Sequence, residues 1–459
     1  MYQIDFTKPV WVHFIGIGGI SMSGLAEVLL GASFRVTGSD SMNSPLVERL
    51  RGLGAEIAIG QCADNISPEM DCVVYTAAIH ADNPEFAAAK ENNLPMLTRA
   101  ELLGQIMKNY GTPVAVAGTH GKTTTTSMAG HIMLAGGLDP TISVGGIMPA
   151  IHGNIRVGNS DSFITEACEY TNSFLSFFPK IEIILNVDAD HLDFFKDLDD
   201  IASSFHRFAQ LLPADGLLIM NRDSKKFDAV TEGLACPVLT YSLQGDADCT
   251  AADISFDESG CASFTCLFRG EEFGRYQLGV PGMHNVSNAL AVIALGRSLG
   301  IPVDCIKKGL SEFRGTERRF EYKGNYRGVS VVDDYAHHPT EISATLTAAE
   351  KYPHKELWVV FQPHTYTRTQ LLLPSFAEAL SAADHVVLAP IYAAREVNTI
   401  GISSDAIREL LDKAGTHAVY IETFNEIEEY LKTHLREGDL LITMGAGNIV
   451  EVGESLLRS

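Results

Sequence analysis

Residues 113–128 read PVAVAGTHGKTTTTSM and form the most informative run in the chain. PVAVA is typical of a buried strand, GTHGK is a glycine-rich turn, and an apolar helical pattern continues to Leu134. A strand that passes through such a turn into a helix directs backbone N–H groups and a helix N-terminus at one point, where they bind phosphate. The run therefore predicts a phosphate-binding α/β unit.

The side chains of this turn favour a nucleoside triphosphate. Lys122 is placed to neutralise the β and γ phosphate oxygens, and the Thr123 hydroxyl is placed to bind Mg²⁺. Val116 stands where the usual spacing has a first glycine. Four consecutive threonines are poor helix formers that packing alone would not select, so we prefer a nucleotide site to a plain glycine turn. The predicted nucleotide-binding residues are Gly118, Thr119, His120, Gly121, Lys122, Thr123 and Thr124.

Acidic residues follow two later apolar runs, SFIT and IILNV. Because parallel α/β sheets bind ligands at the carboxyl ends of their strands, these residues are candidate metal ligands. A solvated acidic loop is the alternative for either group. The candidates are Glu166 and Glu169 after the first run, and Asp188, Asp190, His191 and Asp193 after the second.

The preceding residues contain a second glycine-rich turn. The strand-like VWVHFIG leads into GIGGIS, then into an apolar helical run and another strand that ends at Asp40. This partial GxGxxG pattern suits a dinucleotide, or any phosphate at a helix N-terminus. The candidate residues are Gly16, Gly18, Gly19, Ser21 and Asp40.

Alternation of strands and helices restarts near Arg318 and continues to the end of the chain. Two apolar strands there end in DDYAHHP (333–339) and FQPHTYTR (361–368). Paired histidines without a cysteine or third imidazole at ligand spacing argue against zinc, so we interpret both segments as ligand-binding loops. The predicted class is α/β with three domains: a Rossmann-like domain at 1–110, a P-loop-type ATP-binding domain at 111–317 and a Rossmann-like domain at 318–459.

Composition limits the choice of partners and compartment. Lys and Arg number 34 against 57 Asp and Glu, a net charge of −23 that would repel nucleic acid. No signal peptide pattern and no apolar run of membrane-spanning length are visible, so we expect a cytoplasmic protein that does not bind membranes. The eight cysteines show no CxxC or zinc spacing and are expected to be reduced thiols.

Seven motifs then occur in order, in a resemblance that extends over about residues 10 to 450 of the chain. They are GTHGKTTT, EACE, DADHLDFF, PGMHNVSNA, RRF, DDYAHHPTE and FQPHTYTRT. This series resembles the Mur ligases of peptidoglycan synthesis. The resemblance implies an enzyme that uses ATP and Mg²⁺ to join L-alanine to the lactyl carboxylate of UDP-N-acetylmuramate. An acyl phosphate would be the intermediate, and ADP and phosphate the by-products.

The resemblance also implies roles for individual residues. The loop from Gly16 to Gly24 would hold the UDP-sugar and needs no nicotinamide. Lys122, Glu166 and His191 would be catalytic, with Thr123, Glu166 and His191 holding metal. His284, Asn285, Asn288 and Arg319 would contact ATP, although Arg318 is an adjacent competitor. His338, His364 and Arg368 would bind the amino acid, with Arg368 on its carboxylate.

Three alternatives and one ambiguity stay open from the sequence. A recycling ligase that attaches a tripeptide would share the first two domains, and a nucleotide-dependent switch or an NAD oxidoreductase belongs to another class. Cys168 and the residues Tyr170 to Asn172 depart from the acidic pattern of many relatives. The sequence therefore leaves open whether Glu166 or Glu169 is the metal ligand.

Overall fold

The computed structural model describes residues 2–76, 79–192, 194–394 and 396–459. The chain separates into two compact units. The first comprises Met1–Ala251, Cys266–Gly274 and Ser287–Leu310, and the second Ala252–Thr265, Arg275–Val286 and Ser311–Ser459. The boundary between the units passes through three strands of one sheet.

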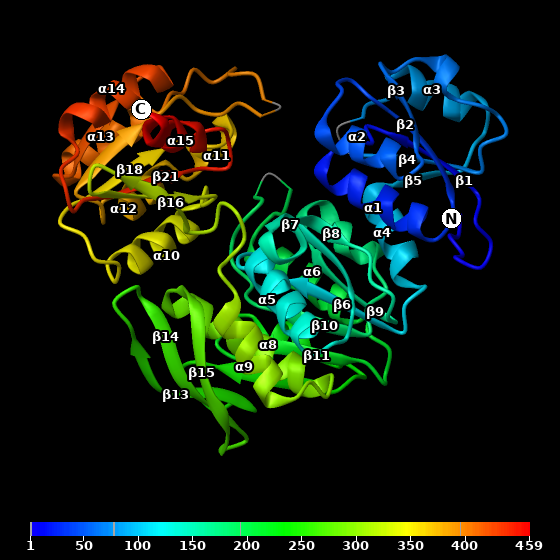
Figure 1. Cartoon of the computed structure of the whole chain (residues 1–459), viewed down its shortest axis with the longest axis horizontal. Coiled ribbons are helices and arrows are strands. Elements are labelled where there is room, and N and C mark those ends of the chain that lie inside the picture. The colour runs from blue at the N-terminus through cyan, green and yellow to red at the C-terminus, as the bar shows by residue number, and fades with distance from the viewer. Residues whose placement is uncertain (1, 77–78, 193, 395) are drawn as a thin grey trace. The chain divides into compact units, whose positions relative to one another are not determined.

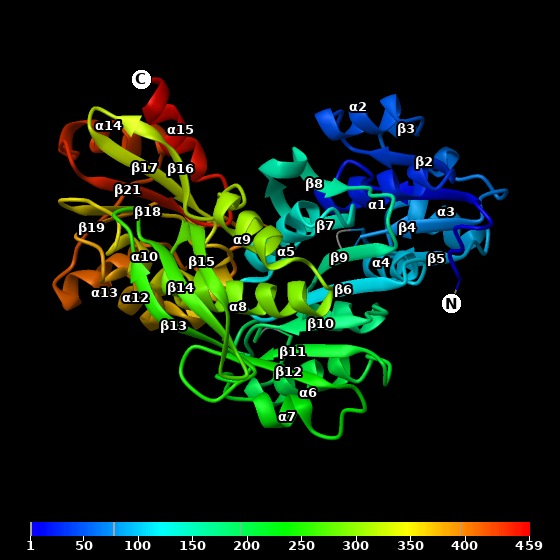
Figure 2. The same cartoon turned by 60° about the horizontal axis from the view of Figure 1, so that its bottom comes forward.

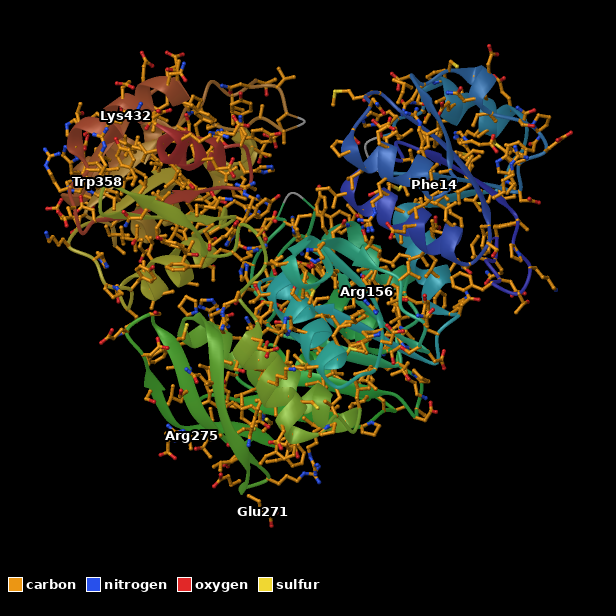
Figure 3. All side chains as sticks on the ribbon, in the orientation of Figure 1. Phe14, Arg156, Glu271, Arg275, Trp358 and Lys432 are labelled. Carbon is orange, nitrogen blue, oxygen red and sulfur yellow. The ribbon has the colours of Figure 1, made fainter. Side chains whose placement is uncertain are left out.

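The N-terminal residues of the first unit form a doubly wound parallel sheet, as the sequence predicts. Among the described residues its strand order is β3-β2-β1-β4-β5, and every pair is parallel. Phe14 of β1 is fully buried in the core (Figure 3). The strands are β1 Trp11–Ile15, β2 Arg35–Asp40, β3 Glu56–Ile59, β4 Cys72–Tyr75 and β5 Met96–Thr98. The helices are α1 Ile20–Gly31, α2 Pro45–Gly52, α3 Pro84–Glu91 and α4 Arg99–Met107, with a short 3-10 turn η1 at Ala63–Asn65.

A second sheet in this unit carries the nucleotide-binding turn. In the described chain its order runs β12-β11-β10-β6-β9-β7-β8 and continues on the β12 side through β13, β14 and β15. Helix α5 packs on β7 and β9 (Figure 1). The predicted strands at PVAVA, SFITEA, IEIIL and LLIMN are confirmed as β6 Thr112–Ala117, β9 Ser162–Ala167, β10 Ile181–Ile184 and β11 Leu217–Asn221. The helices are α5 Lys122–Ala135, α6 Leu198–Ala209, α7 Phe227–Thr231, α8 Met283–Ser298 and α9 Val303–Glu312.

Several elements of this sheet are not anticipated from the sequence. β7 and β8 form an antiparallel pair with an irregular register between Ser143 and Met148, beside the predicted β9. Glycines at 145 and 146 interrupt the alternation that would mark a strand. The additional elements are β7 Thr141–Met148, β8 Gly153–Arg156, β12 Val238–Ser242 and β13 Cys249–Phe256, with the 3-10 segments η2 Pro149–Ile151 and η3 Tyr170–Ser176. The last two strands of this sheet are β14 Cys261–Phe268 and β15 Glu271–Pro281.

The second unit contains the C-terminal sheet, with helices on both faces (Figure 2). Its described strands have the order β16-β17-β21-β18-β19-β20, and only β16 pairs antiparallel. Buried side chains of α10, α12 and α13 form one core layer, and those of α14 and α15 form the other. Trp358 of β18 lies in the second layer (Figure 3). The predicted C-terminal α/β alternation is thereby confirmed, with β16 as an unexpected edge strand.

The bounds in this unit agree with the sequence-based assignment to within a few residues. The strands are β16 Glu321–Tyr326, β17 Val329–Asp334, β18 Leu357–Phe361, β19 His385–Leu388, β20 His417–Tyr420 and β21 Leu440–Met444. The helices are α10 Pro339–Ala349, α11 Tyr366–Leu371, α12 Leu373–Leu380, α13 Asp405–Ala414, α14 Phe424–His434 and α15 Val450–Arg458. Within the described residues, no helix is both long and apolar enough to cross a membrane. All eight cysteines are free thiols, as expected.

Candidate active site

The turn between β6 and α5 has the backbone of a phosphate-binding loop. Gly118 has φ +144° and Gly121 has φ +84°, a region that side chains rarely adopt. A Cβ at Gly118 would also lie 2.9 Å from the Leu185 Cβ. Val116 pairs inside the sheet with Glu166 and Ile183, so the strand continues where the usual spacing has its first glycine. The loop is therefore shorter than usual but keeps its two necessary glycines.

An asparagine that the sequence reasoning missed braces this turn. Asn186 Oδ1 accepts a hydrogen bond from the His120 amide at 2.8 Å, and its Nδ2 donates to the His120 carbonyl at 3.0 Å. The Thr119 hydroxyl accepts from the Asp188 amide at 2.9 Å. These bonds hold the turn against the carboxyl end of β10. The predicted residues Thr119 and His120 thus help to shape the loop.

Lys122 is the first residue of α5, and its ammonium turns back over the loop. Its Nζ donates to the carbonyls of Gly118 at 2.6 Å and Thr119 at 3.1 Å. It also lies 3.0 Å from Oε2 of Glu169, which is only 2% exposed. Burial lowers the pKa of Lys122, but the Glu169 carboxylate outweighs that effect and the pKa is raised. Lys122 is accordingly a fixed positive charge at the mouth of the loop.

Glu166 lies beside the hydroxyl of Thr123. Thr123 Oγ1 donates to Glu166 Oε2 at 3.0 Å, and the amide of Gly145 in β7 donates to Oε1 at 2.5 Å. Two oxygen donors so close together suit Mg²⁺, which binds few protein ligands and completes its shell with water and phosphate oxygens. Within the described part of the chain, no group of three or more His, Cys, Asp or Glu side chains could hold a metal ion. The arrangement fits a magnesium ion shared with a nucleotide better than a metal held by protein alone.

His191, the next predicted metal ligand, has a strained backbone conformation. Its φ is +52°, its amide donates to Asp190 Oδ1 at 2.7 Å, and its ring stacks on Tyr170 with centroids 4.5 Å apart. Among the described residues, neither a hydrogen bond nor an ion pair joins His191 to Glu166. Asp193, the remaining acidic candidate, lies outside the described residues. Strain of this kind at a non-glycine residue is common at functional sites.

Residues of the PGMHN segment differ in burial, since Asn285 is 6% exposed whereas Met283 is 42% exposed. His284 lies against Gly282, where a Cβ would be 2.7 Å from its ring, and burial lowers the pKa of His284 to about 4. Asn285 lies inside α8, which begins at Met283, and its side-chain Nδ2 donates to the Pro281 carbonyl at 2.7 Å. Asn288, in the first unit, has Oδ1 3.2 Å from where a Cβ on Gly121 would lie. Asn288 therefore contacts the nucleotide-binding turn directly.

The N-terminal glycine turn is closed by the end of β2. The amides of Gly16 and Ile17 both donate to the Ser39 carbonyl at 2.9 Å, and Gly18 donates to Asp40 Oδ2 at 2.8 Å. A Cβ at Gly18 would stand 2.9 Å from that same oxygen. Gly19 precedes α1 as its N-cap, without a side-chain cap. The predicted residues thus converge, and Asp40 has a structural role in the turn.

Arg99 is a basic residue at this turn that the sequence reasoning missed. It is the first residue of α4, whose start is fixed by a capping box between Thr98 and Glu101. Its Nη1 donates to Ser21 Oγ at 3.1 Å. Burial lowers the pKa of Arg99, while the charges of Cys168 and Glu166 oppose that shift. The guanidinium therefore lies in the electrostatic range of both the glycine turn and Glu166, a proximity that no sequence spacing reveals.

The adjacent arginines 318 and 319 have different partners in the second unit. Arg318 donates to Asp333 at 2.9 Å and to the carbonyls of Gly445 and Gly447 at 2.7 and 2.9 Å. Arg319 instead lies 3.7 Å from Glu341. Burial raises the pKa of Asp334 to about 6, and the positive charge of Arg319 is the largest influence that opposes this rise. Arg318 is thus committed to the fold, which favours Arg319 as the ligand-binding arginine.

The two predicted C-terminal loops contact each other through aromatic side chains. His364 packs on His337 and on Tyr392, with centroid distances of 5.7 Å in each case. Arg368 lies in α11 and acts electrostatically on His337. His338 is different, because its Nδ1 caps α10 by accepting from the Thr340 amide and its side chain is 6% exposed. Of the predicted amino-acid-binding residues, His364 and Arg368 share a surface with His337, which the sequence reasoning did not select.

Family models match the chain over nearly its whole length. The Mur ligase family, catalytic domain, matches residues 11–111, the Mur ligase middle domain matches 116–296, and the Mur ligase, glutamate ligase domain, matches 318–447. The chain therefore belongs to the Mur ligase family, as its motifs predict.

Individual members of the family are similar to the chain over its whole length. The chain is 57% identical over 458 residues to the UDP-N-acetylmuramate–L-alanine ligase of Agathobacter rectalis, with all of both chains covered. The crystal structure of the UDP-N-acetylmuramate–alanine ligase of Thermotoga maritima matches with a TM-score of 0.81 and 31% identity over 98% of each chain. A murein peptide ligase from Psychrobacter arcticus has a TM-score of 0.71 and 26% identity, again over 98% of each chain.

Proposed function

We propose that this chain is an ATP-dependent ligase that joins L-alanine to the lactyl carboxylate of UDP-N-acetylmuramate. The observation that carries the proposal is the 57% identity, over the full length of both chains, to a ligase of that name. The phosphate-binding turn with its buried lysine agrees with ATP use. We further propose that the reaction takes place in the cytoplasm, where ATP and the UDP-sugar are made.

The residues around the turn would carry out the first half of the reaction. A carboxylate cannot expel oxide, so it first attacks the γ-phosphate of ATP and becomes an acyl phosphate. Lys122 and the loop amides would meet the charge on the phosphates. Thr123 and Glu166 would hold Mg²⁺, with His191 as a further candidate. The bound ion supplies additional charge neutralisation at the γ-phosphate.

The sugar substrate and the nucleotide base would be bound by different segments of the chain. Gly16, Gly18, Gly19 and Ser21 would bind the diphosphate of the UDP-sugar at the N-terminus of α1, while Asp40 keeps the turn in shape. His284, Asn285 and Asn288 would line the adenine side, and Arg319 would contact the ATP phosphates. Each assignment rests on position in the motif series together with the local geometry described above.

The second half of the reaction needs an amine that is not protonated and a carboxylate that is held. Arg368 would bind the L-alanine carboxylate through its guanidinium, which is shaped for two parallel hydrogen bonds. His364, beside His337, would orient the amine, which attacks the acyl phosphate and expels phosphate. The product is an amide.

A tripeptide ligase is the alternative within the same chemistry. The murein peptide ligase of P. arcticus shares the fold but has lower identity and a lower TM-score than the T. maritima alanine ligase. One assay separates the two: ADP release is measured with UDP-N-acetylmuramate and either L-alanine or the tripeptide. Release that requires L-alanine supports the proposal, and release with the tripeptide alone would replace it.

A further inference from the structure

Glu169 is a buried carboxylate that the proposed reaction does not use. Its Oε1 and Oε2 lie 3.2 and 3.0 Å from Lys122 Nζ, and it is 2% exposed. Within the described residues, no donor other than Lys122 forms a hydrogen bond with this carboxylate. Its neighbour Glu166 is bound differently, by Thr123 Oγ1 and the Gly145 amide. The two carboxylates of the EACE motif thus have separate partners.

The three protons of the Lys122 ammonium are matched by acceptors of the protein itself. Two are the carbonyls of Gly118 and Thr119, and the third is the Glu169 carboxylate. A phosphate oxygen that binds Lys122 must therefore replace one of them. The carboxylate is the partner that resembles a phosphate in charge and hydrogen-bonding capacity, whereas the carbonyls are part of the loop backbone.

The Glu169 backbone is anchored independently of its side chain. Its carbonyl accepts from the Asn172 amide at 2.9 Å, where Thr171 and Asn172 have φ values of +54° and +57°. This turn leads into η3, whose Phe174 is fully buried and stacks on Phe208. Movement of the Glu169 side chain away from Lys122 would consequently leave the surrounding fold in place.

We propose that Glu169 is a positioning residue that neutralises and holds Lys122 while the site is empty and yields this place to the phosphates of ATP. The inference rests on the proposed function insofar as the turn from Gly118 to Thr123 binds ATP. It assigns Glu166 and Glu169 to different roles, the first toward Mg²⁺ and the second toward the lysine. Because the carboxylate competes with phosphate for one cation, it weakens nucleotide binding, and most strongly when no Mg²⁺ offsets the added negative charge.

The first test is the affinity for ATP of the Glu169→Gln variant, measured by isothermal titration calorimetry in EDTA. Glutamine keeps the shape and one acceptor but removes the competing charge. We expect ATP to bind about tenfold more tightly than to the wild type, since a charge-assisted hydrogen bond is worth a factor of about ten or more in affinity. Unchanged or weaker binding in EDTA would overturn the proposal.

The matched control is Glu166→Gln, for which we expect the opposite pattern. Its ATP affinity in EDTA should change less than that of Glu169→Gln, because Glu166 bonds to Thr123 and Gly145 and not to Lys122. It should fall below the wild-type value once Mg²⁺ is added. If Glu169→Gln instead shows this magnesium-dependent loss, then Glu169 is a metal ligand and the proposal is wrong.

A double-mutant comparison tests whether Glu169 acts through the lysine. In a Lys122→Met background, Glu169→Gln should no longer tighten ATP binding, because the cation for which the two anions compete is gone. A tightening of equal size in both backgrounds would show that the carboxylate repels ATP directly and would contradict the positioning role.

A measurement without nucleotide covers the case in which Glu169→Gln folds poorly. Glu169→Asp keeps the charge but withdraws it from Lys122 by one methylene. Lys122 should then react faster with an amine-directed label such as trinitrobenzenesulfonate, as located by peptide mapping, because its ammonium loses the direct contact with the Glu169 carboxylate. An unchanged labelling rate would count against the proposal. These binding and labelling results are independent of ADP release with L-alanine, so a failure of the proposed ligase activity would be recognised separately.

Discussion

Lys122 in the first unit and Arg318 in the second are both cations paired with a buried carboxylate near a strand end, but they are held in different ways. Lys122 faces Glu169 and two carbonyls of its own turn. Arg318 joins three separate segments, because it binds Asp333 in β17 and the carbonyls of Gly445 and Gly447 after β21. Asp333 is fully buried and also accepts from Thr443 Oγ1 at 2.6 Å.

The difference shows how a buried ion pair can serve either binding or folding. A compact ammonium can exchange the Glu169 carboxylate for a ligand while its two bonds to the carbonyls of its own turn remain. A planar guanidinium whose donors tie strands together cannot leave without unpairing a buried carboxylate. We therefore expect substitutions at the first pair to change activity and substitutions at the second to change stability.

The largest effect is expected for Lys122→Ala. Loss of the charge that faces the phosphates should lower ATP turnover by about a thousandfold or more. Turnover is measured as ADP release in the presence of both UDP-N-acetylmuramate and L-alanine, with circular dichroism to verify the fold. Lys180→Ala, which removes an exposed partner of Asp215, is the control and should leave activity unchanged. Near-normal turnover of a folded Lys122→Ala protein would refute the phosphate-binding role.

Arg318→Ala should instead lower the stability of the fold. Removal of one partner of a buried pair typically costs about 3 to 5 kcal/mol of unfolding free energy. Trp358 fluorescence reports unfolding of the second unit once Trp11, the other tryptophan, is replaced by Phe. Arg319→Ala is the matched variant: its 3.7 Å pair with Glu341 should contribute less than about 1 kcal/mol, while activity falls. Equal destabilisation by both variants would contradict the assignment of a structural role to Arg318 alone.

Arg368→Ala tests the ligand-binding surface of the second unit. The KM for L-alanine should rise about 10- to 100-fold, because one charge-assisted hydrogen bond is worth about 1.5 to 3 kcal/mol. The KM for ATP should stay nearly constant. Steady-state kinetics with each substrate varied in turn measure both values. Parallel changes in the two constants would mean that Arg368 does not act on L-alanine alone.

The smallest effect concerns Glu182 of β10, a carboxyl that lies close to the nucleotide-binding turn in the same sheet. It is fully buried, and within the described chain neither oxygen has a hydrogen-bond partner. Burial raises its pKa well above the ordinary 4.5. As the pH rises above that value, the unfolded chain loses the proton while the folded chain keeps it, so the native state becomes less stable.

Glu182→Leu should therefore raise the unfolding free energy by about 1 to 2 kcal/mol near pH 8, and by progressively less toward pH 4.5. Urea unfolding across this pH range measures the gap. Glu182→Gln, which cannot ionise, is the control for the pH dependence alone. A gap that is constant or that widens toward low pH would show that the carboxyl is ionised in the folded protein.

Much of the site was predictable because its signals are local. GTHGK supplies glycines at 118 and 121, where the structure has positive φ, and lysine and threonine follow at once. The β7–β8 pair was not predicted, although the Gly145 amide in it binds Glu166. Glycines there hide the strand period, and that pair takes its place from tertiary contacts with β9, α5 and α1.

The sequence by itself determined the class of most elements, the family and the residue types at the site, because periodicity and turn chemistry act over a few residues. The tertiary structure alone decided which carboxylate pairs with Lys122 and which arginine is bound into the fold. Glu169 is 47 residues from Lys122, and Arg318 reaches Gly447 across 129 residues. Arg318 and Arg319 are neighbours of the same type, and they are distinguished by the φ of +62° at Arg318 and by the packing of distant strands, which no local pattern encodes.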